Sequence, residues 1–217
     1  MGAKTWMAVF ADGDARQLLA SQPTLDRDET KRNASVLFPK EKLEPLADTC
    51  LTWTSPPDDE IHMACFPGLT IIAAKEFAID NPSALHARFL DFAGPRTVYL
   101  HAMHSVVDWH AFAVWRNGKL ERSLSLSPDS GIVEDIGQRL AFELPYWDGA
   151  HPAIDPEDME EGEPAYPLPF HPLELAEAAL AEFFGYQLEG VVDNFPVDTE
   201  TIPLLRYKRK KSSFWLR

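Results

Sequence analysis

The residues best suited to chemistry lie around a predicted β-hairpin in the middle of the chain. His104, Asp108 and Ser127 supply an imidazole, a carboxylate and a hydroxyl in one short stretch. In nucleophilic catalysis the imidazole takes the hydroxyl proton and the carboxylate orients the imidazole. These three residues are therefore the candidate catalytic residues of a hydrolase, although the chain has no Gly-x-Ser-x-Gly elbow to support this interpretation.

The register of the hairpin decides which side chains can meet. Asn117-Gly118 is a strong signal for a two-residue turn between strands 109–116 and 119–126. If the pairing continues without a break from this turn, His110 lies opposite Ser125 and Asp108 lies opposite Ser127. We therefore expect His110 and Ser125 to be binding residues beside the candidate catalytic set.

Two simpler interpretations compete with catalysis at this corner. The segment Ser127-Pro-Asp-Ser-Gly131 is typical of a type I turn, and this interpretation is favoured, with Asp129 and Ser130 as candidate binding residues on the turn. A metal site formed by His104, Asp108 and His110 is also conceivable. Histidines that join strands by ordinary hydrogen bonds are commoner, so no metal site is predicted.

Four residues elsewhere complete the candidate binding set. Asp12 and Asp14 end the first predicted strand, where Asp14 is favoured as the cap of the following helix. Trp147 and His171 flank a proline-rich connection. The sequence contains no phosphate-binding loop, dinucleotide fingerprint or paired-cysteine motif, so no nucleotide or redox cofactor is predicted and any cofactor stays unknown.

The elements that must position these residues indicate a single α+β domain over residues 1–207. Turn signals and alternating apolar residues predict a mostly antiparallel mixed sheet with a hairpin at 109–126, covered by about three helices. The expected strands are 4–10, 51–54, 61–66, 69–74, 97–104, 109–116, 119–126 and 201–207. The expected helices are 14–20, 26–37, 83–92 and 173–184, of which the last three form the main cover. Asp26 is the expected cap of the second helix, and the last helix is expected to begin at Pro172 and to end at Gly185. A small parallel part that includes the first strand is an open alternative.

The charge of the chain is distributed unevenly. The 217 residues carry a net charge of −14, whereas residues 206–217 hold six Lys and Arg and no acid. A strongly acidic body disfavours nucleic acid as a partner, because phosphate backbones require a basic face. We expect an acidic surface loop at residues 155–163 and a basic, flexible tail at 208–217. Binding of the segment 206–217 to an anionic surface is a less favoured alternative.

Other features bear on the location of the protein. No apolar stretch is long enough to cross a bilayer, and the start lacks the features of a signal peptide, so we expect a cytoplasmic protein. Cys50 and Cys65 are expected to be reduced.

Several motifs resemble those of an uncharacterised, mainly actinobacterial family whose members carry a domain of unknown function. The clearest of them are Met1-Gly-Ala-Lys-Thr5, Ala11-Asp-Gly-Asp14, Cys65-Phe-Pro-Gly68, Leu100-His-Ala-Met-His-Ser-Val-Val-Asp-Trp109, Arg122-Ser-Leu-Ser-Leu-Ser-Pro-Asp-Ser-Gly131 and Tyr166-Pro-Leu-Pro-Phe-His-Pro-Leu-Glu-Leu175. The resemblance implies no activity. In the family pattern the position of His110 is often apolar, which favours His104 as the functional histidine.

These observations predict two functions of different classes. The favoured function is that of a non-catalytic module that binds a small molecule or a protein partner, because no recognised catalytic motif is present. The alternative is a hydrolase, with or without a metal, that uses His104, Asp108 and Ser127.

Overall fold

The computed structural model describes residues 2–154, 166–190 and 195–211. The predicted acidic loop at 155–163 lies outside the described residues. The strands are β1 (Lys4–Ala11), β2 (Glu41–Pro45), β3 (Thr49–Cys50), β4 (Glu60–Phe66), β5 (Leu69–Ala73), β6 (Thr97–His104), β7 (Trp109–Arg116), β8 (Lys119–Ser127), β9 (Gly131–Gly137) and β10 (Pro203–Lys211). The α-helices are α1 (Ala15–Ala20), α2 (Arg27–Leu37), α3 (Ala87–Ala93), α4 (Leu144–Trp147) and α5 (Pro172–Phe184).

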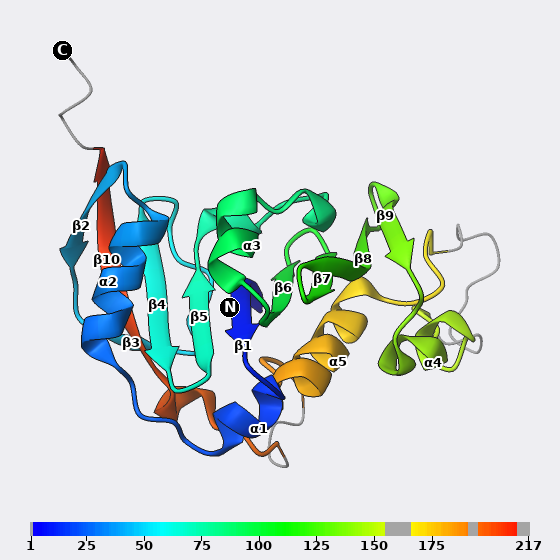
Figure 1. Ribbon diagram of the computed structural model, residues 1–217. Coiled ribbons are helices and arrows are strands. Elements are labelled where there is room, and N and C mark those ends of the chain that lie inside the picture. Colours follow the sequence, from blue (N-terminus) through cyan, green and yellow to red (C-terminus); the bar gives the residue numbers. More distant parts are fainter. Residues whose placement is uncertain (1, 155–165, 191–194, 212–217) are drawn as a thin grey trace.

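One large antiparallel sheet organises the fold and confirms the α+β prediction (Figure 1). The strand order is β2-β10-β4-β5-β1-β6-β7-β8-β9, with β3 paired to β10. The first strand is central and pairs antiparallel with both β5 and β6, so the parallel part considered from the sequence is not present among the described strands. Three strands differ from the sequence prediction. The edge strands β2 and β9 were not expected, because they contain few alternating apolar residues. The strand expected at 51–54 is wrong, since that segment is a turn and irregular chain and only the two residues before it form a strand, β3.

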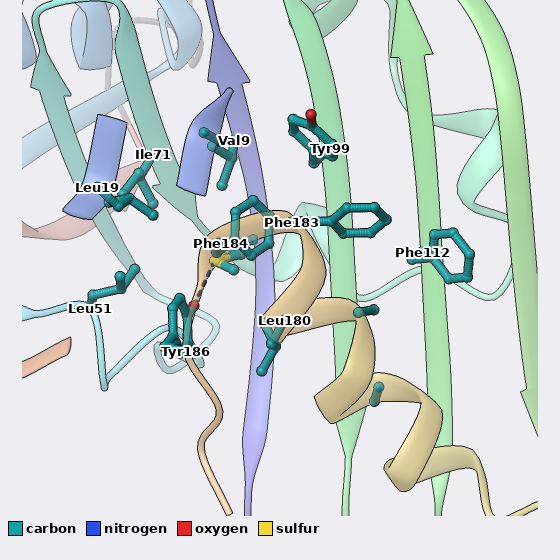
Figure 2. Packing of buried hydrophobic residues seen from close by; sticks show 14 of the residues in the cluster. Val9, Leu19, Leu51, Ile71, Tyr99, Phe112, Leu180, Phe183, Phe184 and Tyr186 are labelled. Atoms are coloured by element: carbon teal, nitrogen blue, oxygen red, sulfur yellow. Dashed lines mark hydrogen bonds between the residues drawn. The ribbon is translucent and has the colours of Figure 1, made fainter. Parts of the chain in front are cut away.

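Alternate residues of the strands pack into two hydrophobic cores, one on each face of the sheet. Met7 and Val9 belong to the core under α1 and α5, and Ala8 and Phe10 belong to the core under α2 and α3. Figure 2 shows the first core, in which Tyr99, Phe183 and Phe184 come together where α5 crosses the sheet. The sheet is therefore covered on both faces, and a change of strand register moves a side chain from one core to the other.

The ends of α2 and α5 follow the capping signals of the sequence. Asp26 caps α2 by accepting the backbone N–H of Glu29, as predicted. Pro172 begins α5 and Gly185 ends it in the left-handed conformation, also as predicted. In place of the single helix expected at 83–92, the structure has a short 3₁₀ turn at 82–84 followed by α3 (Ala87–Ala93). The second helix begins separately because the His86 side chain accepts the backbone N–H of Arg88 and so caps α3.

The structure confirms the predicted turn at Asn117-Gly118. The predicted strand register, however, holds only for the first two residue pairs next to this turn. Trp115 pairs with Leu120 as expected, whereas Val114 pairs with Arg122 because Glu121 is an extra residue in a β-bulge. The bulge lies against Gly137 of β9, where a side chain would not fit: a Cβ atom there would lie 2.0 Å from the Glu121 carbonyl oxygen. Every later side chain of β8 consequently points to the opposite face from the one predicted.

The shift places Arg122 in the core under α5. Its guanidinium is fully buried and donates to both oxygens of Glu143, which is also fully buried, with Nε–Oε1 and Nη2–Oε2 distances of 2.9 and 2.7 Å. Asp135 and the carbonyl of Ile136 accept further hydrogen bonds from Arg122. The ion pairs hold the chain after β9 against the sheet and raise the pKa of Arg122 despite its burial.

The basic segment differs from the prediction over its first part. Residues 208–211 do not start a tail: they continue β10, which runs between β2 and β4 as far as Lys211. Arg206, Lys208 and Lys210 form ion pairs with carboxylates, and Arg209 pairs with Glu41 and Glu76. These four side chains therefore neutralise neighbouring acids and do not form a free cationic surface. Residues 212–217 lie outside the described part of the chain.

Two further observations concern the described residues. Cys50 and Cys65 are both free thiols. None of the described helices combines the length and the apolar character that crossing a membrane would require.

Candidate functional site

A cavity of about 470 Å³ lies at the end of the sheet where β6, β7 and β8 meet. We call it the Trp pocket and define it by its lining residues, which are Trp6, Ala78, Asp80, His104, Val107, Trp109, Ser127, Asp129 and Ser130. It contains four residues predicted from the sequence, namely His104, Ser127, Asp129 and Ser130. The candidate catalytic Asp108 is not among its lining residues.

The sheet register explains why three aromatic side chains line this pocket together. His104 is the backbone partner of Trp109, and Trp6 is the partner of Ala102, two residues before His104. Because side chains two residues apart on a strand share a face, Trp6, His104 and Trp109 all point to the α3 side of the sheet. Their rings cover the polar end of that face, beyond the apolar core.

Three of the four ring nitrogens of these side chains are either hydrogen-bonded or shielded from solvent. Trp109 donates its indole N–H to the Oγ atom of Ser125 at 3.3 Å. The ring of Trp6 lies nearly parallel to that of His104, with 8° between the planes and 6.3 Å between the centroids. Trp6 Nε1 and His104 Nδ1 are shielded from solvent and have no hydrogen-bond partner among the described residues. The rings therefore offer mainly carbon surface to the pocket.

The polar wall of the pocket is a tight turn between β8 and β9. Ser127 accepts the backbone N–H of Ser130 on its Oγ atom at 3.1 Å, and Gly131 takes a positive φ of 66°. This is the turn that the sequence favours, and the Ser127 hydroxyl serves it as a hydrogen-bond acceptor. Asp129 lies exposed at the tip of this turn.

The two charged side chains that line the pocket are acidic, whereas Lys4, the strand partner of His104, lies beside it. Asp80 and Asp129 are exposed carboxylates that form no ion pair within the described residues, and no Lys or Arg lines the cavity. Burial and the neighbouring charge of Lys4 both lower the pKa of His104, so its imidazole is neutral at pH 7. The site therefore combines aromatic rings with two carboxylates and no cation.

Asp108 lies away from the other two members of the candidate catalytic set. It occupies the β6–β7 turn with a positive φ of 46°, and its carboxylate lies 3.6 Å from the ring of His171. His171 caps α5 by accepting the backbone N–H of Leu173, and its ring stacks on Tyr166. Asp108 is therefore placed to bind the start of α5 and not to orient His104.

His110 and Ser125 lie on opposite faces of the sheet, so the prediction that they are neighbours is wrong. The bulge at Glu121 pairs His110 with Leu126 and turns Ser125 toward Trp109. His110 is fully buried beside His101, with 5.1 Å between ring centroids. Burial lowers the pKa of both rings, that of His101 to about 4, which makes them neutral core residues.

The remaining predicted binding residues lie at other places. Asp14 caps α1, as favoured from the sequence, and lines a different cavity with Tyr99, Arg116 and Glu182, whereas Asp12 lines neither cavity. Trp147 packs under Arg139, whose guanidinium carbon lies 3.9 Å from the ring centroid. The described residues contain no group of three or more side chains arranged to hold a metal ion.

Five of the nine lining residues were not predicted from the sequence, and three of these, Trp6, Asp80 and Trp109, give the pocket its rings and one of its charges. Trp6 and Trp109 were read only as apolar strand residues. A signal was available for Trp109, which is next to the polar turn at the end of its strand, but the pairing of β1 with β6 that brings Trp6 beside it joins distant parts of the chain. Asp80 lies between two short 3₁₀ turns with no motif of its own.

In comparisons with known proteins, the chain matches one protein family but no individual curated protein or solved structure. Neither a curated protein nor a solved structure is significantly similar to the chain. A family model described as a family of unknown function, DUF6928, matches residues 5–207, which include all the residues of the Trp pocket. The chain therefore belongs to the DUF6928 family of unknown function.

Proposed function

We propose that this protein is a binding module and that its small-molecule ligand occupies the Trp pocket. The observation that carries the proposal is the joint lining of one cavity by two indoles, an imidazole and two carboxylates, contributed by three strands and two loops. A cavity of about 470 Å³ lies within the ordinary range for small-molecule sites, roughly 300 to 1,000 Å³. Mostly apolar walls with a few polar groups are the usual composition of such sites.

The alternative proposal is a hydrolase, and one observation favours it: His104 and Ser127 line the same cavity. Three others support binding instead. The Ser127 hydroxyl accepts the Ser130 N–H, Asp108 pairs with His171, and no hydrogen bond joins His104 to Ser127 within the described residues. A nucleophilic serine needs a base within hydrogen-bond reach and a group that orients this base.

A fragment screen by ligand-observed NMR tests the binding proposal. We expect fragments that bind the intact protein to lose binding in Trp109→Leu, which removes one wall of the pocket. Trp53→Leu is the matched control, because Trp53 is 55% exposed and lines a different cavity. Binding that is equal in the two variants, or a screen without any bound fragment, would refute the proposal.

The hydrolase alternative has its own test. Turnover of a panel of activated esters should be absent from the intact protein if the site only binds. Turnover that disappears in both Ser127→Ala and His104→Gln, while circular dichroism shows both variants folded, would establish the hydrolase and displace the binding proposal.

A further inference from the structure

We propose that the ligand of the Trp pocket is an organic cation, with an ammonium group held between the two carboxylates and an apolar body against the indoles. This inference rests on the proposed function and names the class of ligand. It follows from the charge of the pocket, from the chemistry of its rings and from the polar groups left free to meet a ligand.

Neither carboxylate of the pocket forms an ion pair within the described residues. Around β10 the acidic side chains are matched by basic ones, as in the pairs of Arg209 with Glu41 and Glu76. Asp80 and Asp129 have no such partner among the described residues, and they face the same cavity from opposite loops. The two carboxylates that line the cavity outnumber the one neighbouring cation named above, Lys4, so the pocket attracts cations and repels anions.

The rings favour the same ligand. The face of an indole carries negative charge in its π system and therefore attracts an ammonium group. The indole N–H of Trp109 is used by Ser125, and Trp6 Nε1 and His104 Nδ1 are shielded, so none of these atoms is free to bind a ligand. A neutral imidazole at His104 adds no positive charge to oppose a cation.

The same inventory disfavours a sugar or another neutral polyol. Such ligands need several donors and acceptors matched to their hydroxyls, because an unmatched polar group loses its bonds to water. The Ser127 hydroxyl is already an acceptor in the turn. The polar side-chain groups that remain in the lining are the two carboxylates, His104 Nε2 and the hydroxyls of Ser127 and Ser130. Only the carboxylates among them carry a charge, so the lining suits a positive charge better than a ring of hydroxyls.

The test compares three molecules of similar shape by NMR titration: choline, its neutral carbon analogue 3,3-dimethylbutan-1-ol, and the anion 3,3-dimethylbutanoate. We expect choline to bind about tenfold more tightly than the alcohol and the anion not to bind. Asp129→Asn, in an exposed turn where the fold does not depend on it, should weaken choline binding about threefold and leave alcohol binding unchanged. Asp148→Asn, an exposed carboxylate outside the pocket, is the control.

Each other result has a distinct meaning. If choline and the alcohol bind equally and both lose binding in Trp109→Leu, the cation inference is overturned and the binding proposal stands. If choline binding is insensitive to Trp109→Leu and Asp129→Asn, the cation binds elsewhere and the inference is overturned. If none of the three molecules binds while other fragments bind in a Trp109-dependent manner, the inference fails alone; if no fragment binds either, both proposals fail.

Discussion

The buried His101 gives a prediction about acid stability that can be worked out from its surroundings. Its Nε2 atom lies 3.0 Å from the carbonyl oxygen of Ala176 in α5, and the ring is fully buried. Burial lowers its pKa from 6.5 to about 4. Between these two values the unfolded chain takes up a proton that the folded chain excludes, so the free energy of unfolding falls as the pH falls.

The size of this effect follows from the two pKa values. One pH unit between them costs about 1.4 kcal/mol, so His101 should remove about 2 kcal/mol of stability between pH 7 and pH 5 and about 3 kcal/mol once the pH reaches 4. Above pH 6.5 the ring is neutral in both states and contributes no pH dependence. His110 acts in the same direction, because burial also lowers its pKa.

The intact protein alone cannot isolate this contribution, because Glu177 acts in the opposite direction. Burial raises the pKa of Glu177 to about 7, so between pH 7 and 4.5 the folded state holds a proton that the unfolded state releases. Stability from this group increases as the pH falls. The useful quantity is therefore the difference between the intact protein and a variant that lacks only the titrating ring.

We expect urea denaturation of His101→Gln to show this difference. Relative to the intact protein, the variant should gain about 2 kcal/mol between pH 7 and pH 5, whatever its stability at pH 7. His151→Gln, which removes an exposed histidine, should run parallel to the intact protein over the same range. If His101→Gln is also parallel to the intact protein, the ring is protonated in the folded state and the reasoning from burial is wrong.

Three further predictions concern the fold. Arg122→Ala should lower the free energy of unfolding, measured by chemical denaturation, by about 3 to 5 kcal/mol, because it leaves the buried Glu143 carboxylate unpaired. A loss below about 1 kcal/mol would show that Glu143 takes up a proton or reaches water. Gly137→Ala should lower the melting temperature more than Gly118→Ala. Both glycines have positive φ, but only Gly137 leaves no space for a Cβ atom. Equal losses would contradict the close packing of Gly137 against the bulge at Glu121. Deletion of residues 208–217 should strongly lower the melting temperature and speed amide exchange in β2. Deletion of residues 212–217 alone should change both quantities less. Equal effects of the two deletions would refute the pairing of β10 with β2.

Local signals predicted those parts of the fold that depend on neighbouring residues. The caps at Asp26 and Gly185 and the turn at Asn117-Gly118 are all decided within a few residues, and all are confirmed. The end of β10 was missed for a different reason. A run of basic residues is typical of a tail, and only its pairing with acids on distant strands makes it part of a sheet.

The candidate site could be predicted only in part, because one residue changed the geometry of the rest. The pairs next to Asn117-Gly118 were predicted correctly, but the predicted partner of His110 was wrong. The cause is the bulge at Glu121, which requires Gly137 of the next strand. The same bulge turned Ser125 toward Trp109 and brought Ser127 to the face that carries His104. The sequences of β7 and β8 alone therefore could not predict the register shift, because it depends on β9.

The position of β10 has a consequence for how the protein is made. This last strand separates β2 from β4, both of which are synthesised early, so a nascent chain that stops before residue 203 leaves two strand edges open to other chains. Contacts between such distant segments form slowly and only after the whole chain is available. A premature stop codon shortly before residue 203 would therefore leave an aggregation-prone product, even though all the residues of the Trp pocket had been translated.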